Sequence, residues 1–150
     1  MPGRAFGTGA HPTTRACVEL LARSEPASVL DAGCGSGVLA IVSARLGFEP
    51  VRAVDADAAA VEASRANAEL NGVEIDVSLA DVRDESLPVA DLLLANIDLR
   101  VVEALLERWP GERAIVSGYL AHETPAAKGW TRGERLELEG WAADSLARTV

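Results

Sequence analysis

The chain contains 150 residues, and its 14 Lys and Arg against 23 Asp and Glu give a formal net charge of −9. This length predicts a single domain over residues 1–150, and a composition with 49% hydrophobic and 25% charged residues excludes an intrinsically disordered chain. The acidic balance argues against a nucleic-acid partner and against an anionic membrane surface, because both require a stripe of Lys and Arg.

The N-terminal part of the chain is predicted to form a helix followed by a strand. Apolar residues with helical spacing follow Thr13 and Thr14, which we expect to cap the helix, and the helix should end near Arg23. Residues 28–32 then form a short apolar strand, and a glycine cluster follows it directly.

The next segment alternates helices with strands. Residues 38–46 have a helical pattern, and residues 51–55 form the second strand. Asp57 is placed to cap a long helix that continues through Leu70. Residues 73–79 alternate apolar and polar side chains, which predicts the third strand.

Beyond these elements the pattern continues and then weakens. Residues 91–95 form an apolar run of the kind found in strands that are buried on both faces. Residues 101–106 are predicted to be helical, and residues 113–117 form the fifth strand. Between Gly118 and Gly133 at most one short helix fits.

The C-terminal residues are predicted to form a hairpin. Leu136 and Leu138 alternate with glutamates, Gly140 permits a turn, and residues 142–147 form the last strand. Strands that alternate with helices predict a parallel sheet with helices on both faces. The expected fold is therefore α/β and Rossmann-like, a mostly parallel seven-stranded sheet with an antiparallel C-terminal hairpin.

Membrane insertion, secretion and metal binding are not expected. No apolar run approaches the roughly 18 residues of a membrane span, and the N-terminus has no apolar signal region. Cys17 and Cys34 have neither the spacing of a metal site nor that of a disulfide framework. We expect a cytoplasmic protein with two reduced, half-buried thiols, no metal, and neither a membrane nor a nucleic-acid partner.

The glycine cluster after the first strand is the most informative motif. Gly33, Gly35 and Gly37 allow unusual backbone angles and the close approach of a ligand to the main chain. Asp55 ends the second strand, where an acid accepts hydrogen bonds from ribose hydroxyls. Loop and acid together predict a ligand that carries a nucleoside.

The charge and spacing of this loop favour S-adenosylmethionine over NAD. The dinucleotide fingerprint requires Gly or Ala where this chain has Val38. Asp31, two residues before the first glycine, would oppose a pyrophosphate but would suit the ammonium and sulfonium of S-adenosylmethionine. Asp31 could instead only order the amides of the loop.

Several segments together resemble a known family. The stretch VLDAGCGSG with AVDAD is similar to the core of class I S-adenosylmethionine-dependent methyltransferases. With three further segments the chain resembles the ribosomal protein L-eleven methyltransferase family (PrmA type), from Pro2 to about Gly118. These segments are PGRAFGTGAHPTT at residues 2–14, NAELNGV at residues 67–73 and ANI at residues 95–97.

The resemblance implies a set of cofactor-binding residues. By matching position, the family's contacts fall on Thr14, Gly33, Asp55 and Asn96, and the loop adds Gly35 and Asp31. Asp81, just past the third strand, is placed to contact the adenine, or else it is a solvated acid in a turn.

Asn96 is the candidate catalytic residue that the resemblance implies. Its oxygens can orient an amine acceptor, although it could instead only cap the following helix. Asp98 is either a general base or the N-cap of that helix, and His11 is a proton acceptor or orders the loop. Phe6 is either part of the core or a lid over the cofactor.

The expected activity is transfer of a methyl group from S-adenosylmethionine to an amine of a protein or a small molecule. The resemblance implies that the protein substrate is recognised by a separate N-terminal domain, and we expect this chain to lack that domain, because its sequence begins at the cofactor motif. A separate substrate-recognition chain is therefore an expected partner. The alternatives are a small-molecule O- or C-methyltransferase and a catalytically silent cofactor-binding subunit.

Overall fold

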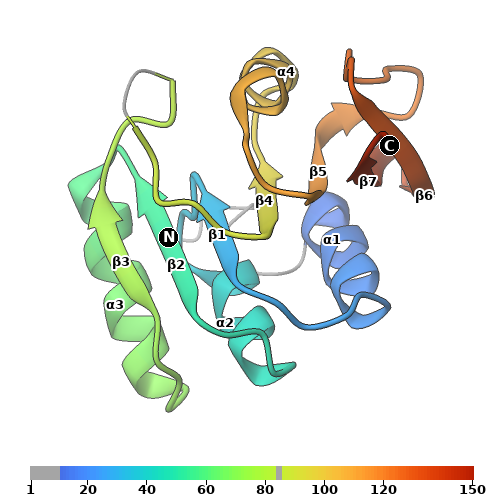
Figure 1. The fold of residues 1–150 in the computed structure, drawn as a ribbon. Coiled ribbons are helices and arrows are strands. Elements are labelled where there is room, and N and C mark those ends of the chain that lie inside the picture. The colour runs from blue at the N-terminus through green and yellow to red at the C-terminus, as the bar shows by residue number, and fades with distance from the viewer. Residues whose placement is uncertain (1–10, 84–85) are drawn as a thin grey trace.

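The computed structural model describes residues 11–83 and 86–150, in which seven strands form one sheet (Figure 1). Phe6 and most of the segment 2–14 therefore lie outside the described residues. The strands are β1 (Val29–Ala32), β2 (Val51–Asp55), β3 (Asp76–Leu79), β4 (Leu92–Asn96), β5 (Arg113–Leu120), β6 (Trp130–Leu138) and β7 (Trp141–Arg148). The helices are α1 (Pro12–Ala22), α2 (Val38–Arg45), α3 (Ala58–Leu70) and α4 (Leu99–Arg108).

The strands follow the order β3-β2-β1-β4-β5-β7-β6 across the sheet. Strands β1 to β5 pair in parallel, and β7 runs antiparallel to both β5 and β6. This order confirms the predicted α/β fold with a mostly parallel sheet and an antiparallel C-terminal hairpin.

Helices cover both faces of the sheet, as predicted. Val29 of β1 belongs to a buried cluster that includes residues of α1, α2 and α3. Its neighbour Leu30 belongs to a second cluster, which includes residues of α4. Since both side chains are fully buried, β1 is a parallel strand that is covered on both faces.

Acidic residues cap two of the helices at the positions expected from the sequence. The Asp57 carboxylate accepts a hydrogen bond of 2.9 Å from the backbone N–H of Ala59 at the start of α3. The Asp98 carboxylate accepts a bond of the same length from Arg100 at the start of α4. Asp98 therefore acts as an N-cap, which stabilises a helix by roughly 1 kcal/mol.

The predicted cap of the first helix is wrong. Helix α1 begins at Pro12, and the imidazole of His11 accepts a hydrogen bond from the backbone N–H of Thr13. Thr13 and Thr14 are buried in the first turn instead. Proline suits this first helical position because its missing N–H would have no partner there.

The largest differences from the predicted element boundaries are in three strands, β3, β5 and β6. Strand β3 starts at Asp76 because pairing with β2 begins only at Arg52. Strand β5 continues to Leu120 across an irregularity between Ser117 and Tyr119. No helix forms over residues 121–129, and β6 already begins at Trp130.

Both cysteines are free and buried, so the expected half-burial is wrong. Cys17 is fully buried on the inner side of α1, and Cys34 is 8% exposed in the glycine loop. The sequence placed both near apolar residues but did not reveal that Cys17 would pack into the cluster between α1 and the sheet or that Cys34 would lie against Ser64 of α3.

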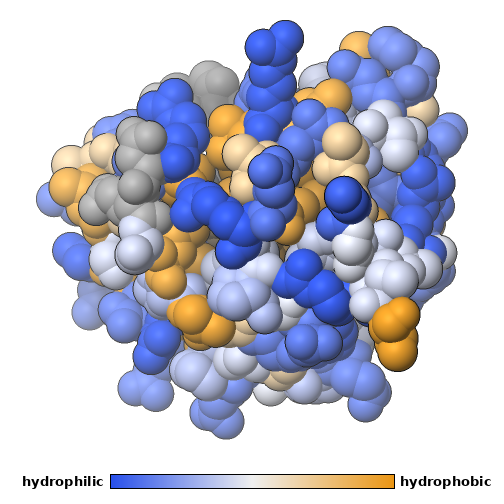
Figure 2. All heavy atoms as spheres, turned by 45° about the horizontal axis from the view of Figure 1, so that its top comes forward, coloured by the Kyte–Doolittle hydropathy of each residue, from blue (hydrophilic) through white to orange (hydrophobic). Residues whose placement is uncertain are grey.

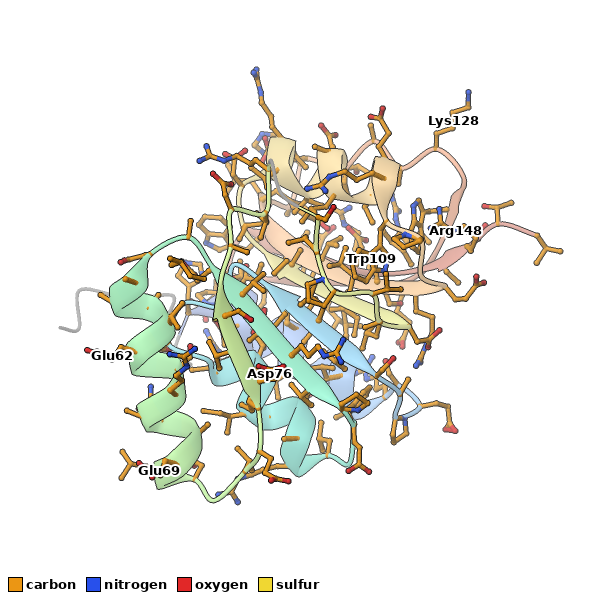
Figure 3. The ribbon with its side chains drawn as sticks, turned by 60° about the vertical axis from the view of Figure 1, so that its left-hand side comes forward. Glu62, Glu69, Asp76, Trp109, Lys128 and Arg148 are labelled. Atoms are coloured by element: carbon orange, nitrogen blue, oxygen red, sulfur yellow. The ribbon has the colours of Figure 1, made fainter. Side chains whose placement is uncertain are left out.

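The C-terminal hairpin is fastened to α4 by aromatic and cationic side chains. The indole N–H of Trp130 donates to the carbonyl of Leu106 at 2.9 Å. The Arg148 guanidinium lies 4.0 Å from the centre of the Trp130 ring and donates to the carbonyl of Trp109, beside which it lies in Figure 3. These contacts connect the antiparallel strands β6 and β7 to the C-terminal end of α4.

Candidate functional site

A crevice lies at the carboxyl end of the sheet between β1 and β4. The chain continues from β1 to β2 on one side, and β4 leads to β5 on the other, so the strand order reverses here. Ligands of open α/β sheets bind at this position. In Figure 2, which turns the upper side of Figure 1 forward, hydrophobic residues lie between hydrophilic ones.

A hollow of about 60 Å³ lies in this crevice. Its lining residues come from α1, β1, the glycine loop, α2 and β4, and they are Thr14, Asp31, Gly33, Cys34, Gly35, Val38, Leu39 and Asn96. Five of the predicted cofactor residues therefore meet in one place. Because ligand pockets usually measure roughly 300–1,000 Å³, this hollow has room for only one end of a nucleoside-bearing ligand.

The glycine loop is shaped by hydrogen bonds to the end of β2. The carbonyl of Val54 accepts from the backbone N–H groups of both Gly33 and Cys34, at 2.8 and 2.9 Å. Gly33 has a φ of +76°, and a Cβ atom there would lie 2.7 Å from the Ile97 side chain. Only glycine fits at this position without displacing its neighbour.

Two polar residues of α3 hold the outer part of the loop. The Ser64 hydroxyl donates to the carbonyl of Gly35 at 2.7 Å, and the Asn67 amide donates to the carbonyl of Ser36 at 2.9 Å. Sequence reasoning missed both roles, although Asn67 belongs to one of the segments that carried the resemblance. These two bonds connect the loop to α3, and the bonds from its N–H groups connect it to the end of β2.

Asp55 lies at the rim of the crevice and bonds to the backbone. One carboxylate oxygen accepts from the N–H of Gly35 and the other from the N–H of Asp57, each at 2.9 Å. Each oxygen of a carboxylate has a second lone pair. Asp55 can therefore hold the loop and still accept hydrogen bonds from hydroxyl groups of a ligand.

Asp31 is a buried carboxyl group on the floor of the hollow. Its side chain is 2% exposed, and its Oδ2 has no hydrogen-bond partner among the described residues. Burial raises the pKa of Asp31 to about 7, and the nearby Asp55 contributes, while a backbone hydrogen bond from Ala40 acts in the opposite direction. A positively charged group in the hollow would compensate for this burial.

Asn96 presents a second acceptor without a partner to the same hollow. Its side-chain Nδ2 donates to the Thr13 hydroxyl at 3.1 Å, whereas its buried Oδ1 has no partner among the described residues. Two unsatisfied acceptors in one crevice indicate that its ligands supply hydrogen-bond donors or positive charge. Such an arrangement suits an ammonium or an amine better than a phosphate.

Cys34 also lines the hollow, and its thiol is poorly suited to act as a nucleophile there. Burial raises the pKa of its thiol to about 12, and the acidic neighbours Asp31 and Asp55 contribute to this rise. Its sulfur lies 3.3 Å from the Ser64 hydroxyl. The thiol is therefore neutral near pH 7, which disfavours thiolate chemistry at this position.

Asp81 lies outside the lining of the hollow. Its carboxylate accepts from the backbone N–H of Arg83 at 2.9 Å and pairs with the Arg83 guanidinium at 3.2 Å. This pairing lowers the pKa of Asp81. The geometry is that of a turn acid held by its neighbour, and contact with an adenine stays a prediction.

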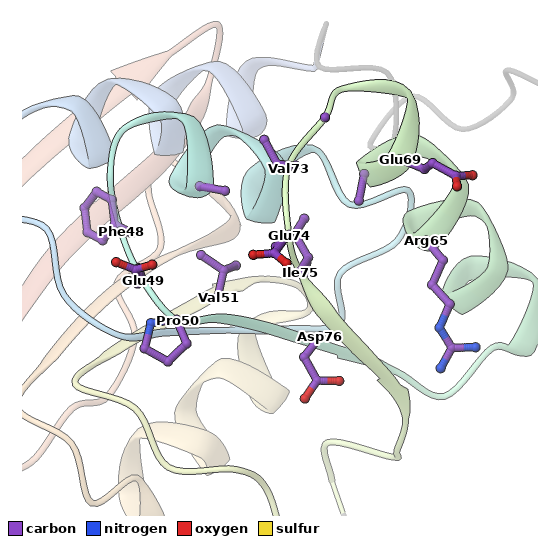
Figure 4. Close-up of a pocket in the computed structure, with 13 residues that line it drawn as sticks. Phe48, Glu49, Pro50, Val51, Arg65, Glu69, Val73, Glu74, Ile75 and Asp76 are labelled. Carbon is purple, nitrogen blue, oxygen red and sulfur yellow. The ribbon is translucent and has the colours of Figure 1, made fainter.

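A larger hollow, of about 860 Å³, lies at the opposite end of the strands (Figure 4). It is bordered by the segments that lead into β2 and β3 and by the end of α3, with Phe48 and Ile75 among its apolar residues and Glu69 on its rim. The amino ends of parallel strands do not form the ligand crevice of this fold class, so size alone is a poor guide to the site.

The described residues 11–83 and 86–150 contain no group of three or more His, Cys, Asp or Glu side chains that could hold a metal ion. Over the same ranges, none of the helices has the length and apolar character needed to cross a membrane.

The two loop glycines should respond differently to alanine. We expect G33A to lower the free energy of unfolding by about 2–4 kcal/mol, because of its positive φ and the collision with Ile97. Gly35 has a φ of +56°, but no atom lies within 4 Å of a Cβ placed there. G35A should therefore cost only about 1 kcal/mol of stability.

Urea denaturation and cofactor titration compare the two variants, G33A and G35A. Because Gly35 lines the hollow, G35A should weaken cofactor binding more than it weakens folding. Equal losses of stability in the two variants would contradict the packing described for Gly33.

The family model and the sequence relatives compared with this chain agree on one family. A family model for ribosomal protein L11 methyltransferase (PrmA) matches residues 1–147. The ribosomal protein L11 methyltransferase of Dechloromonas aromatica is 50% identical over 132 residues, which cover 81% of this chain and 43% of that protein. The one of Paraburkholderia xenovorans is 41% identical over 161 residues, covering 98% of this chain and 52% of that protein. The chain spans about half the length of the curated relatives it matches.

Solved structures show the same architecture. The ribosomal protein L11 methylase of Lactobacillus delbrueckii subsp. bulgaricus superposes with a TM-score of 0.86 at 25% identity, covering 95% of this chain and 81% of that chain. Magnesium protoporphyrin IX methyltransferase of Synechocystis, solved with bound SAM, has a TM-score of 0.69 at 16% identity, with coverage of 90% and 77%. The second likeness concerns the Rossmann-like fold alone.

Proposed function

The chain belongs to the ribosomal protein L11 methyltransferase family (PrmA), and we propose that it transfers a methyl group from S-adenosylmethionine to an amine nitrogen of a protein. The observation that carries the proposal is the pair of buried acceptors without partners, Asp31 Oδ2 and Asn96 Oδ1, in the crevice beside the glycine loop.

The residues of the crevice fit this cofactor. S-Adenosylmethionine carries an ammonium, a sulfonium and a ribose, and it has no phosphate. A buried carboxylate such as Asp31 would attract the positive amino-acid end. Asp55 retains lone pairs for the ribose hydroxyls, and Gly33 and Gly35 permit close approach to the main chain. Thr14, which lines the same hollow, adds a hydroxyl at the first turn of α1.

When bound, S-adenosylmethionine supplies an electrophilic methyl group. The protein's contribution to such an in-line displacement is mainly alignment. Asn96 Oδ1 can accept a hydrogen bond from the N–H of the attacking amine, which directs the nitrogen lone pair and stabilises the positive charge that develops. An acceptor lysine must lose its proton beforehand, since its ordinary pKa is about 10.4.

The acidic surface favours a cationic acceptor. A net charge of −9 attracts basic peptides and amines and repels acidic ones. Relatives of this chain are named for ribosomal protein L11, so a ribosomal protein is the first acceptor to test. Such an acceptor implies a cytoplasmic reaction. A separate chain that recognises the substrate stays a prediction.

Transfer of an isotopically labelled methyl group tests this function. The chain is incubated with methyl-labelled S-adenosylmethionine and ribosomal protein L11, and the products are mapped by peptide mass spectrometry. We expect label on amine nitrogens of the protein and none with heat-denatured chain. Label found instead on hydroxyl or carbon atoms of small molecules in a host lysate would contradict N-methylation of a protein.

A further inference from the structure

Three side chains form a hydrogen-bonded series from the start of α1 to the hollow. The ring nitrogen Nδ1 of His11 lies 2.7 Å from the Thr13 hydroxyl oxygen, and this oxygen accepts from Asn96 Nδ2 at 3.1 Å. The series ends at Asn96 Oδ1, which is buried in the hollow without a partner among the described residues. The methyl-transfer role proposed for Asn96 does not by itself explain why its amide faces in this direction.

The direction of every bond in the series follows from one backbone group. The N–H of Thr13 donates to His11 Nδ1 at 3.2 Å, so this nitrogen must be unprotonated. The Thr13 hydroxyl must then donate its single proton to His11 Nδ1. Its oxygen is left with lone pairs only, and it can bind Asn96 solely through the NH₂ group of the amide. Asn96 Oδ1 therefore has to face the hollow.

We infer that His11 and Thr13 are positioning residues, which hold the Asn96 side chain with its oxygen towards the reacting groups. The inference rests on the methyl-transfer function proposed above. A backbone N–H can only donate a hydrogen bond. The donor and acceptor roles of the His11 and Thr13 side chains, and with them the orientation of the Asn96 amide, are therefore fixed. In the opposite orientation Asn96 would present two N–H donors to the hollow, where they would repel an ammonium and would bind the lone pair that an attacking amine needs.

The surroundings of His11 support the neutral imidazole. Trp141 packs edge-on against the ring, with 4.9 Å between ring centroids. Burial and the positive charge of Arg15 lower the pKa of His11, while Glu139, which pairs with Arg15 at 2.5 Å, acts in the opposite direction. Acidification that protonates Nδ1 would break the bond from the Thr13 N–H and remove the acceptor that orients the Thr13 hydroxyl.

Nuclear magnetic resonance of the imidazole nitrogens tests the series without any activity measurement. The chain has two histidines, and His122 is exposed, so it serves as an internal reference. At pH 7.5 we expect His11 to carry its proton on Nε2, with Nδ1 unprotonated and shifted as a hydrogen-bond acceptor. A proton on Nδ1 would overturn the inference whether or not the chain transfers methyl groups.

Matched variants test the consequence for transfer. T13V replaces the hydroxyl with a methyl group of similar size, and we expect kcat to fall 10-fold to 100-fold while the Kd for S-adenosylmethionine changes less than 3-fold. T13S should restore kcat to within 3-fold of the wild-type value. H11A should also lower kcat, whereas H11N, whose side-chain oxygen can only accept, should recover most of it and abolish the acidic limb of the pH profile.

The outcomes separate this inference from the proposed function. If the wild-type chain transfers methyl groups and T13V retains full kcat, the positioning roles are refuted and the function stands. If the wild-type chain transfers no methyl group while the imidazole spectrum is as expected, the function is refuted and the bond directions stand. H122N, which alters an exposed residue outside the site, should leave the pH profile unchanged.

Discussion

Replacing Asp31 with Asn is expected to weaken S-adenosylmethionine binding and to stabilise the free protein at pH 8. A hydrogen bond to a charged group is worth roughly 1.5–3 kcal/mol, so loss of the carboxylate should raise the Kd by about 10-fold to 100-fold. Without a ligand the same carboxylate lowers the free energy of unfolding, because Asp31 is 2% exposed and its Oδ2 has no partner among the described residues. D31N should therefore lower the affinity for S-adenosylmethionine while it raises the stability of the free protein.

The contribution of Asp31 to the stability of the free protein decreases as the pH rises. The pKa of Asp31 is raised from 3.8 in an unfolded chain to about 7 in the folded protein. Its contribution to stability is therefore complete below pH 4 and is lost as the pH rises through 7. A shift of this size corresponds to about 4 kcal/mol, and an unpaired buried amide costs about 1–3 kcal/mol, so D31N should be about 1–3 kcal/mol more stable at pH 8.

Urea denaturation at pH 4 and pH 8 and calorimetric titration with S-adenosylmethionine measure both effects. D76N is a suitable control, because Asp76 is exposed at the start of β3 and the change in charge is the same. A D31N variant that binds S-adenosylmethionine as tightly as the wild type, or that is less stable at pH 8, would refute the role given to this carboxyl group.

Replacing Asn96 with Ala is expected to reduce turnover far more than cofactor binding. Loss of one preorganised polar group at a site of developing charge typically costs 10²-fold to 10³-fold in kcat, or about 3–4 kcal/mol. The Asn96 side chain makes one hydrogen bond to a described residue, the bond to Thr13. The truncation should therefore disturb the fold little.

Single-turnover kinetics with a saturating cofactor, together with calorimetry, distinguish catalysis from binding. N71A is the matched control, since Asn71 is an exposed asparagine at the end of α3, remote from the crevice. Equal losses of cofactor affinity and turnover in N96A would reassign Asn96 to a binding role alone.

Local rules predicted most of the scaffold from the sequence. Asp57 and Asp98 were recognisable as caps because a capping acid needs only the residues that follow it. The glycine loop was recognisable because its spacing reflects backbone geometry within a few residues. The start of β3 at Asp76 was not, because it depends on where β2 offers a pairing partner, and this is a property of the assembled sheet.

The roles that sequence reasoning missed are long-range contacts. Ser64 and Asn67 bind the carbonyls of the glycine loop from the middle of α3, about 30 positions further along the chain. The capping role of His11 was missed since Thr13 and Thr14 are stronger capping types, yet Pro12 is the first helical residue, which places the cap two residues before Thr13. The sequence left two interpretations of His11, a proton acceptor or a residue that orders the loop. The inference above adds a third, in which His11 orients Asn96.

Calorimetric titration of the wild-type chain with S-adenosylmethionine, and in parallel with NAD, tests most directly the assignment of the crevice. The buried carboxylate of Asp31 and the acceptor Asn96 Oδ1 favour a cationic amino-acid end over a pyrophosphate. We expect one molecule of S-adenosylmethionine to bind per chain, more weakly below pH 7, and NAD not to bind. Binding of NAD without binding of S-adenosylmethionine would contradict the assignment.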